Sequence, residues 1–287
     1  MALLDKVKEN EVLKQHGEQY KDFLEQSKDN IVLSPSGLRG FVSNRGEWYQ
    51  NVVMREKTFM GNKSSTLGNL IHTFIDDYYN DSLNKDGTLA DWKVKQIAKT
   101  FPESIAEFER LYGFIKDVYL DNSNKPDYRE HYLEYDVSDT VKLAGSFDAM
   151  IKENDEWVII DYKSSGKSFK DMEAYILQLS VYSLLVELCM GIKVSKLRIV
   201  GFITTKEPKV LIIEDKPNIK FAKELLNNVM YALNLAKENE DLKELLFPYN
   251  YFDMFSSEKR LGSKEPMFKE LDKTTVIRNK LKQSVFG

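Results

Sequence analysis

Two neighbouring segments with the composition of β-strands place the strongest constraint on the fold of this chain. Residues 141–152 and 156–163 are rich in apolar and aromatic residues, and Glu-Asn-Asp at 153–155 is typical of a hairpin turn. An aspartate, Asp148, lies in the first segment, and the triplet Asp-Tyr-Lys at 161–163 ends the second. We therefore expect two paired strands, one carrying an acid and the other an acid and a lysine.

The side chains of these residues are expected to converge. Alternation along a strand puts Asp161 and Lys163 on one face and Tyr162 on the other, and pairing of the strands brings Asp148 to the same patch. Two carboxylates and an ammonium at one place suit a divalent cation, an attacking water and a phosphate. Solvated aspartates are the alternative, but strands are depleted in Asp, and Asp161 follows the apolar run 157–160. The pattern favours a metal-dependent nuclease.

Further motifs in a fixed order give this pattern a family resemblance. They are Leu-Ser-Pro-Ser-Gly-Leu at 33–38 with Glu-Trp-Tyr at 47–49, Gly-Asn-Leu-Ile-His at 68–72, Gly-Ser-Phe-Asp at 145–148, and Gln-x-x-x-Tyr at 178–182. Together with the acid-x-lysine triplet they resemble the PD-(D/E)XK nuclease superfamily. More narrowly, they resemble the branch of the RecB nuclease domain and its small stand-alone exonuclease relatives. The triplet alone is weak evidence, whereas the ordered set is specific.

The resemblance implies a set of catalytic and metal-binding residues. Asp148, Asp161 and Lys163 would be catalytic, with Lys163 orienting the attacking water and offsetting charge on the phosphate. Mg²⁺ or Mn²⁺ would be bound by His72, Asp148, Asp161 and the backbone carbonyl of Tyr162. Without its motif, His72 would more often be a structural residue on the polar edge of an apolar helical stripe.

A second group of residues is expected to contact the substrate. Gln178 and Tyr182 share one helix face, which in the family packs beside the strands and contacts the active site or a DNA phosphate. A polar pair on a half-buried helix is the alternative. Ser164, Ser165 and Lys167 follow the catalytic lysine and are expected to bind phosphate.

Two questions about acidic residues stay open. Relatives carry an acid one strand before the glycine-x-x-aspartate motif, and either Glu130 or Glu134 could supply it. Asp76, one helical turn after His72, could orient the imidazole, but a solvated residue is the simpler expectation.

Composition limits the cofactors and the location. Cys189 is the single cysteine, which excludes an intramolecular disulfide and the four-cysteine iron–sulfur cluster of some relatives; Asn44 stands where their signature has a cysteine. No apolar run looks long enough to cross a bilayer and the start lacks a signal-peptide pattern, so we expect a cytoplasmic protein, bacterial or in an infected host cell, without a membrane partner. The net charge of −4 is mild evidence against a nucleic-acid enzyme, although the position of charge matters more than its sum.

The order of expected elements predicts the fold class. Helical patterns occupy 3–28, a segment capped by Ser34, a segment after Thr66, and 92–97, 105–115, 172–190 and 218–238; strand patterns occupy 128–137, 141–152, 156–163, 196–203 and 210–214. This order predicts an α/β, three-layer, restriction-endonuclease-like core with a mixed central sheet flanked by helices, plus an N-terminal helical region. We expect that helical region, with the histidine motif, at 1–125, the PD-(D/E)XK nuclease core at 126–248, and a basic C-terminal tail at 249–287.

The expected activity is hydrolysis of DNA phosphodiester bonds to leave 5′-phosphates. The resemblance favours an exonuclease acting on single- or double-stranded ends in recombination, repair or replication, with a phage-encoded enzyme as one setting. A helicase, a recombinase or a single-strand-binding protein are candidate partners, because no Gly-x-x-x-x-Gly-Lys motor loop is present. Three alternatives remain: a structure- or sequence-specific endonuclease on the same core, an inactive binding or assembly protein, and an RNA-processing nuclease.

Overall fold

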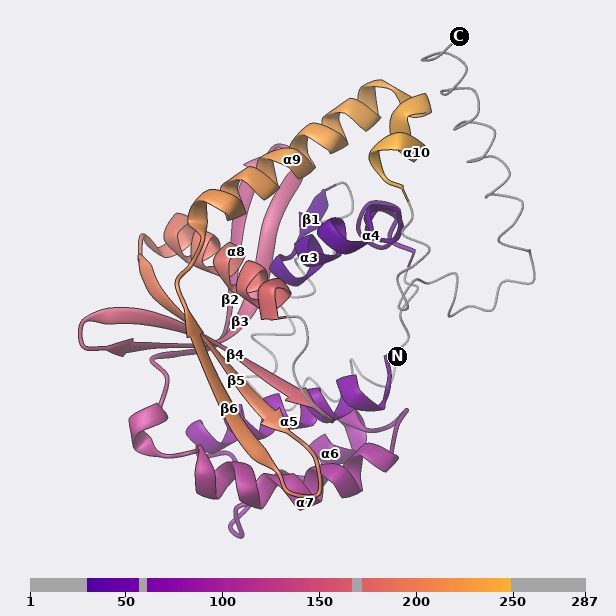
Figure 1. Ribbon diagram of the computed structural model, residues 1–287. Coiled ribbons are helices and arrows are strands. Elements are labelled where there is room, and N and C mark those ends of the chain that lie inside the picture. The colour runs from indigo at the N-terminus through magenta and orange to yellow at the C-terminus, as the bar shows by residue number, and fades with distance from the viewer. Residues whose placement is uncertain (1–29, 57–60, 167–171, 249–287) are drawn as a thin grey trace.

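A mixed sheet of six strands lies between two layers of helices (Figure 1). This computed structural model describes residues 30–56, 61–166 and 172–248. The strands are β1 (Ile31–Leu33), β2 (Tyr128–Ser138), β3 (Val141–Glu153), β4 (Glu156–Ser165), β5 (Val194–Ile203) and β6 (Lys209–Asp215). One helical layer contains α5 (Lys63–Tyr79), α6 (Asp91–Ile97) and α7 (Glu103–Val118); the other contains α3 (Pro35–Ser43), α8 (Met172–Met190) and α9 (Ile219–Glu238), with the short helices α4 (Arg45–Val52) and α10 (Lys243–Leu246) beside it. The three-layer α/β prediction is confirmed; the expected helix at 3–28 and the tail at 249–287 lie outside the described residues.

The sheet mixes parallel and antiparallel neighbours. Its strand order is β1-β3-β4-β5-β6, and β2 also pairs with β3. The pairs β1–β3 and β4–β5 are parallel, whereas β2–β3, β3–β4 and β5–β6 are antiparallel. Parallel neighbours need a crossover connection, and α8 provides it between β4 and β5.

Strand β3 changes partners along its length, and this opens the sheet. Its first residues, 141–143, pair with β1, whereas its last residues, 149–153, pair with β4. Residues 144–148 pair with neither of these strands in the part of the chain that the structure describes, although β2 still follows the other edge of β3. Strand β4 continues past this point with β5 alone on its flank. A split between β3 and β4 results.

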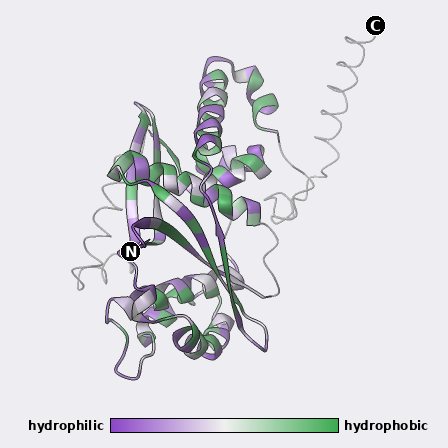
Figure 2. Cartoon of the chain, turned by 60° about the vertical axis from the view of Figure 1, so that its left-hand side comes forward, coloured by the Kyte–Doolittle hydropathy of each residue, from purple (hydrophilic) through white to green (hydrophobic). Residues whose placement is uncertain are grey.

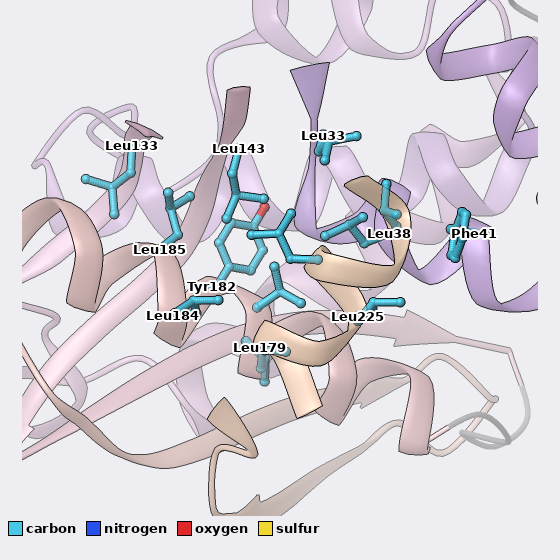
Figure 3. Close-up of a cluster of buried hydrophobic side chains, with 14 of the residues drawn as sticks. Leu33, Leu38, Phe41, Leu133, Leu143, Leu179, Tyr182, Leu184, Leu185 and Leu225 are labelled. Carbon is cyan, nitrogen blue, oxygen red and sulfur yellow. The ribbon is translucent and has the colours of Figure 1, made fainter. Parts of the chain in front are cut away.

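Alternation along β4 divides the hydrophobic core into two clusters. Val158, Ile160 and Tyr162 pack with the layer of α5 and α7, whereas Ile159 packs with the layer of α3, α8 and α9. Figure 3 shows the second cluster, where Tyr182 and leucines of several elements meet. Both clusters contain residues from either side of position 125, so the N-terminal helices and the later strands share their cores.

Helix α8 is apolar around most of its surface because other elements cover it. It contacts α3, α9 and strands β2 to β5, and polar and apolar stretches alternate along most of the remaining chain (Figure 2). By length and composition this 19-residue helix could cross a membrane, so the expectation that no run is long and apolar enough is wrong. Of its most apolar window, 56% is buried inside the fold, as in the core helix of a globular domain.

The N-terminal caps of three helices follow from short polar side chains. Ser34 caps α3 as predicted, its hydroxyl accepting from the backbone N–H of Gly37 at 2.9 Å. Helix α5 begins earlier than the predicted cap Thr66, because Asn62 and Ser65 form a reciprocal capping box at 2.8 and 2.9 Å. Asn44, at the position where some relatives have cysteine, caps α4.

Candidate active site

The two predicted acids lie where β3 and β4 separate. The last ladder pair is Ala149 with Ile160, and Asp148 and Asp161 are the next residues on each strand. The Asp148 carboxylate accepts a hydrogen bond from the backbone N–H of Tyr162 at 2.7 Å. At this point the Asp148 side chain, and not the backbone of β3, bonds to the backbone of β4. The two strands then diverge around the carboxylates of Asp148 and Asp161.

Asp161 and Lys163 share one face of β4, as alternation requires. The Nζ of Lys163 donates to Oδ1 of Asp161 at 2.7 Å, and Nε2 of Gln178 donates to the same oxygen at 3.3 Å. Asp161 is buried, with 3% of its surface exposed, and its Oδ2 finds no donor among the described residues. A buried carboxylate oxygen without a partner is costly, so it marks a position where a positive ligand fits.

His72 reaches the split from α5, on the other face of the sheet. Its Nε2 donates to the carbonyl oxygen of Tyr162 at 2.8 Å. Its Nδ1 lies 3.5 Å from Oδ1 of Asp148 and 3.9 Å from Oε1 of Glu130. The structure therefore brings His72 together with Asp148 and the Tyr162 carbonyl, while Asp161 lies on the adjoining side of the split.

The acid one strand earlier is Glu130 and not Glu134. The atoms of His72, Glu130 and Asp148 that could ligate a metal all lie within 4.8 Å of one another. The carboxylate of Glu134 is instead bound by Lys142 and by the hydroxyl of Tyr132, the latter at 2.9 Å. The two glutamates are four residues apart, so alternation alone puts both on the same face and does not distinguish them.

Glu130 has a strained backbone. Its φ of +40° lies in the left-handed region, which residues with a side chain rarely adopt. Glu130 falls between the pairs Arg129–Ala149 and His131–Phe147, opposite Asp148. Phe147 packs in one hydrophobic cluster and Ala149 in the other, although residues two apart share a face in a regular strand. The irregularity thus coincides with the point where both carboxylates meet His72.

Burial and mutual repulsion set the protonation of the acids. Burial and the charge of Asp148 raise the pKa of Asp161 to about 6, against the attraction of Lys163. The same two causes raise the pKa of Glu130 to about 8. Burial would also raise the pKa of Asp148, but the positive charges of His72 and Lys163 hold it below its ordinary value. The cluster thus contains three acids against two basic side chains, His72 and Lys163.

While no cation is bound, both basic side chains of the cluster are charged, and His72 must lose a proton before its imidazole can ligate a metal. Burial opposes protonation of His72, but the negative charges of Asp148 and Glu130 outweigh it and raise the imidazole pKa to about 9. Burial likewise opposes the charge of Lys163, and Asp161 and Asp148 overcome it, so the pKa of the ammonium is raised. A charged ammonium of this kind is suited to act through its charge and its hydrogens rather than as a strong base.

The donor set fits a divalent cation. Carboxylate and carbonyl oxygens with one imidazole nitrogen suit Mg²⁺ or Mn²⁺. The unpartnered Oδ2 of Asp161, the close group of His72, Glu130 and Asp148, and the raised pKa values of two acids all indicate missing positive charge.

The residues predicted to contact substrate occupy different positions. Gln178 is buried and binds Asp161, as described above. The hydroxyl of Tyr182 donates to the carbonyl of Ser146 at 2.7 Å, just before Asp148 on β3. This contact requires Gly145, because a Cβ there would lie 3.2 Å from that hydroxyl and 3.0 Å from Cδ of Pro35. Tyr182 therefore holds the backbone of the split strand.

The polar residues after the lysine are less close to the site. Ser164 lies on the α5 face, where a Cβ on Gly68 would be 3.6 Å from its Oγ. The carbonyl of Ser165 accepts from the backbone N–H of Thr204 at 2.8 Å. Lys167 lies outside the described residues.

A small cavity opens onto the candidate site from the α5 side. His72, Asp76, Glu130, Asp148 and Tyr162 are among the residues that line it. Asp76, for which a solvated position is the simpler expectation, is half-buried in this wall.

Comparison with known proteins identifies the family. A model of the PD-(D/E)XK nuclease superfamily matches residues 32–247. The chain belongs to the PD-(D/E)XK nuclease superfamily. No curated protein matches its sequence. Among the similar solved structures are a proposed exonuclease from Eubacterium rectale, at 20% identity and a TM-score of 0.48 over 74% of this chain and 81% of that one, and the protein SSO0001, at 14% identity and a TM-score of 0.36 over 75% of this chain and 82% of that one.

Proposed function

We propose that this member of the nuclease superfamily is a Mg²⁺- or Mn²⁺-dependent deoxyribonuclease that leaves 5′-phosphates. One observation carries the proposal: a buried carboxylate oxygen of Asp161 has no donor among the residues that the structure describes, beside a charged lysine at a split in the sheet. A domain that only binds or assembles gains nothing from an unpaired buried acid, because that acid costs stability. Catalysis gives it a use.

Each residue of the split has a distinct task in the proposed reaction. Asp148, Asp161, His72 and the Tyr162 carbonyl would hold the cation, which would supply Lewis acidity toward a phosphate oxygen and a water. Glu130 lies against His72 and orients it. Gln178 fixes the rotamer of Asp161.

Lys163 is the remaining catalytic group. It is held 2.7 Å from Oδ1 of Asp161, and its ammonium has further hydrogens to donate. One of these orients the attacking water, and the positive charge offsets the charge that develops on the phosphate.

We propose an exonuclease as the mode of action, because the motifs resemble stand-alone RecB-like exonucleases. A role in recombination, repair or replication follows from that branch, as do a cytoplasmic location, a phage origin as one setting, and cooperation with a helicase, a recombinase or a single-strand-binding protein. A structure-specific endonuclease on the same core is the second candidate.

The test compares DNA with and without ends. End-labelled linear single- and double-stranded DNA and covalently closed circles are incubated with Mg²⁺, Mn²⁺ or EDTA. Asp161→Asn and Lys163→Met should abolish cleavage, and Lys142→Met, which removes a lysine bound to Glu134 away from the site, should not. We expect stepwise shortening of linear DNA and intact circles.

Two outcomes would change the proposal. Rapid cutting of closed circles would replace the exonuclease with the endonuclease. Cleavage that persists undiminished in Asp161→Asn would remove the site assignment.

A further inference from the structure

One aromatic ring beside the candidate site is shared by two cations. Nζ of Lys163 lies 5.4 Å from the ring centroid of Tyr175, and Cζ of Arg39 lies 5.1 Å from the same centroid. The three residues come from β4, α8 and α3. The ring attracts each cation. It therefore holds two positive groups where an anion could contact both of them.

Arg39 has hydrogen-bond donors to spare. Its side chain is half-buried, yet within the described ranges no oxygen accepts a hydrogen bond from its guanidinium and no acid pairs with it. Arg110 and Arg198, by contrast, are engaged: Arg110 donates to the carbonyls of Thr204 and Thr205, and Arg198 to two glutamates. A guanidinium with five free N–H groups is suited to an oxyanion.

The position of α3 places Arg39 close to the split. Pro35, at the first turn of α3, lies against Gly145 of β3, where a Cβ would be 3.0 Å from its ring. Arg39 follows one helical turn later, on the same side of the helix. Lys163, which shares the ring, is itself bound to Asp161. Arg39 thus contacts the same ring as Lys163, and Lys163 in turn contacts Asp161 of the candidate metal site.

We propose that Arg39 binds a backbone phosphate of the DNA strand next to Lys163, and that Tyr175 is a positioning residue that holds both cations. This inference rests on the proposed nuclease function. Arg39 takes two phosphate oxygens with its planar fork. The contact involves no base, so it serves every DNA sequence equally.

The test measures DNA binding apart from cleavage. Fluorescence anisotropy with labelled single- and double-stranded oligonucleotides is followed over a salt series, with Ca²⁺ in place of Mg²⁺ to limit turnover. Loss of one phosphate contact lowers the slope of log affinity against log salt by about 0.7 for single strands and about 0.9 for duplex DNA. We expect this change in Arg39→Gln, equally for unrelated sequences. Arg39→Lys should recover part of the affinity, because it keeps the charge without the fork.

A neighbouring arginine provides the matched control. Arg45→Gln removes the same charge from the adjoining helix α4, where the guanidinium lies 4.5 Å from the ring of Phe41 instead. Its salt slope should stay near the wild-type value. Equal slopes for Arg39→Gln and Arg45→Gln would overturn the phosphate position.

Tyr175 is tested by kinetics with Mg²⁺. Tyr175→Leu should raise KM and lower kcat, because it releases both Arg39 and Lys163, and Tyr175→Phe should recover most of both losses because it keeps the ring. Arg39→Gln should act mainly on KM. If Tyr175→Phe and Tyr175→Leu behave alike, the positioning role is wrong.

The outcomes separate this inference from the function on which it rests. A wild-type protein that neither binds nor cuts DNA refutes the nuclease. A wild-type protein that cuts DNA, while Arg39→Gln binds and cuts as well as it does, refutes the phosphate position alone.

Discussion

The sheet carries two charged clusters that use similar residues with opposite results. One, the site cluster of His72, Glu130, Asp148, Asp161 and Lys163, lies where β3 and β4 separate. The other, the Arg198 cluster of Arg198, Lys196, Glu153 and Glu214, lies beside the turn where the same strands are joined.

In the Arg198 cluster both glutamates accept hydrogen bonds from the arginine. Arg198 donates to both oxygens of Glu153, at 2.6 and 2.7 Å, and to Glu214 at 2.6 and 2.8 Å. Hydrogen bonds from Arg198 lower the pKa of both glutamates. In the site cluster, burial and neighbouring acids raise the pKa of Asp161 and Glu130 instead. The acids of the first cluster are all paired, whereas the second keeps a buried carboxylate oxygen of Asp161 without a partner among the described residues.

The largest effect should follow removal of the unmatched acid. Asp161→Asn is expected to lower the rate of DNA cleavage by roughly 1000-fold, since loss of cation-assisted stabilisation amounts to about 4 kcal/mol. In EDTA the same variant should melt at a higher temperature than the wild type, because the repulsion from Asp148 is gone. Cleavage assays measure the loss of rate, and calorimetry measures the change in Tm. If Asp161→Asn melted at a lower temperature than the wild type in EDTA, Asp161 would stabilise the fold. The contrast drawn between the two clusters would then be wrong.

The choice between the two glutamates gives the next largest effect. Glu130→Gln should reduce cleavage and metal affinity by roughly 10–100-fold, as for groups that orient a metal ligand. Glu134→Gln, the matched control four residues away, should cleave normally because Glu134 pairs with Lys142 and Tyr132. Isothermal titration with Mn²⁺ and cleavage rates provide the comparison. A loss confined to Glu134→Gln would move the site cluster to the other glutamate.

The matched cluster should contribute to stability and leave cleavage unchanged. Arg198→Met is expected to lower the free energy of unfolding by about 2 kcal/mol, because the partly buried Glu153 and the more exposed Glu214 lose their partner. The control Lys220→Met breaks an exposed pair with Glu224 at 3.8 Å and should change it by less than about 0.5 kcal/mol. Urea unfolding measures both. Equal effects would mean that the Arg198 cluster is no stronger than an ordinary surface pair.

The smallest effect is the pH dependence of that stability. Because folding lowers the pKa of Glu153 and Glu214, their contribution is present above the ordinary value of 4.5 and is lost as pH falls through the lower folded values. Below pH 4.5 the Tm of the wild type should therefore fall more steeply than that of Arg198→Met. If the Tm of the wild type and of Arg198→Met fell in parallel below pH 4.5, Arg198 would not be what lowers the pKa of the two glutamates.

Most of the fold could be predicted from the sequence because its elements are regular. The strands at 141–152 and 156–163 extend only to Glu153 and Ser165, and α8 ends before Gly191, whose φ is +66°. The three-residue strand β1 was not expected, because so short a segment has no measurable periodicity. Helix α5 starts before Thr66 because the cap depends on a reciprocal pair of hydrogen bonds that several nearby polar residues could have formed.

The candidate site was predictable as a set of residues but not as an arrangement. The motifs named Asp148, Asp161, Lys163, His72 and Gln178, and these lie together, although their roles stay predictions. Alternation could not anticipate that β3 leaves β4 beside Asp148, since partner exchange depends on β1 and β2. It also could not choose Glu130, whose distinguishing property is an irregular backbone. A glutamate beside a break in strand alternation is the signal that would have found it.

The left-handed conformation of Glu130 has an evolutionary consequence. Glycine adopts this φ without steric cost, so a glutamate there lowers stability, and the role proposed for its carboxylate gives a reason to keep it. A descendant that abandoned catalysis would be free to relax, and replacement by glycine would make its fold more stable by about 1 kcal/mol. Glycine at this position in a related chain would therefore indicate loss of the role proposed for Glu130, even where the acids on β3 and β4 are kept.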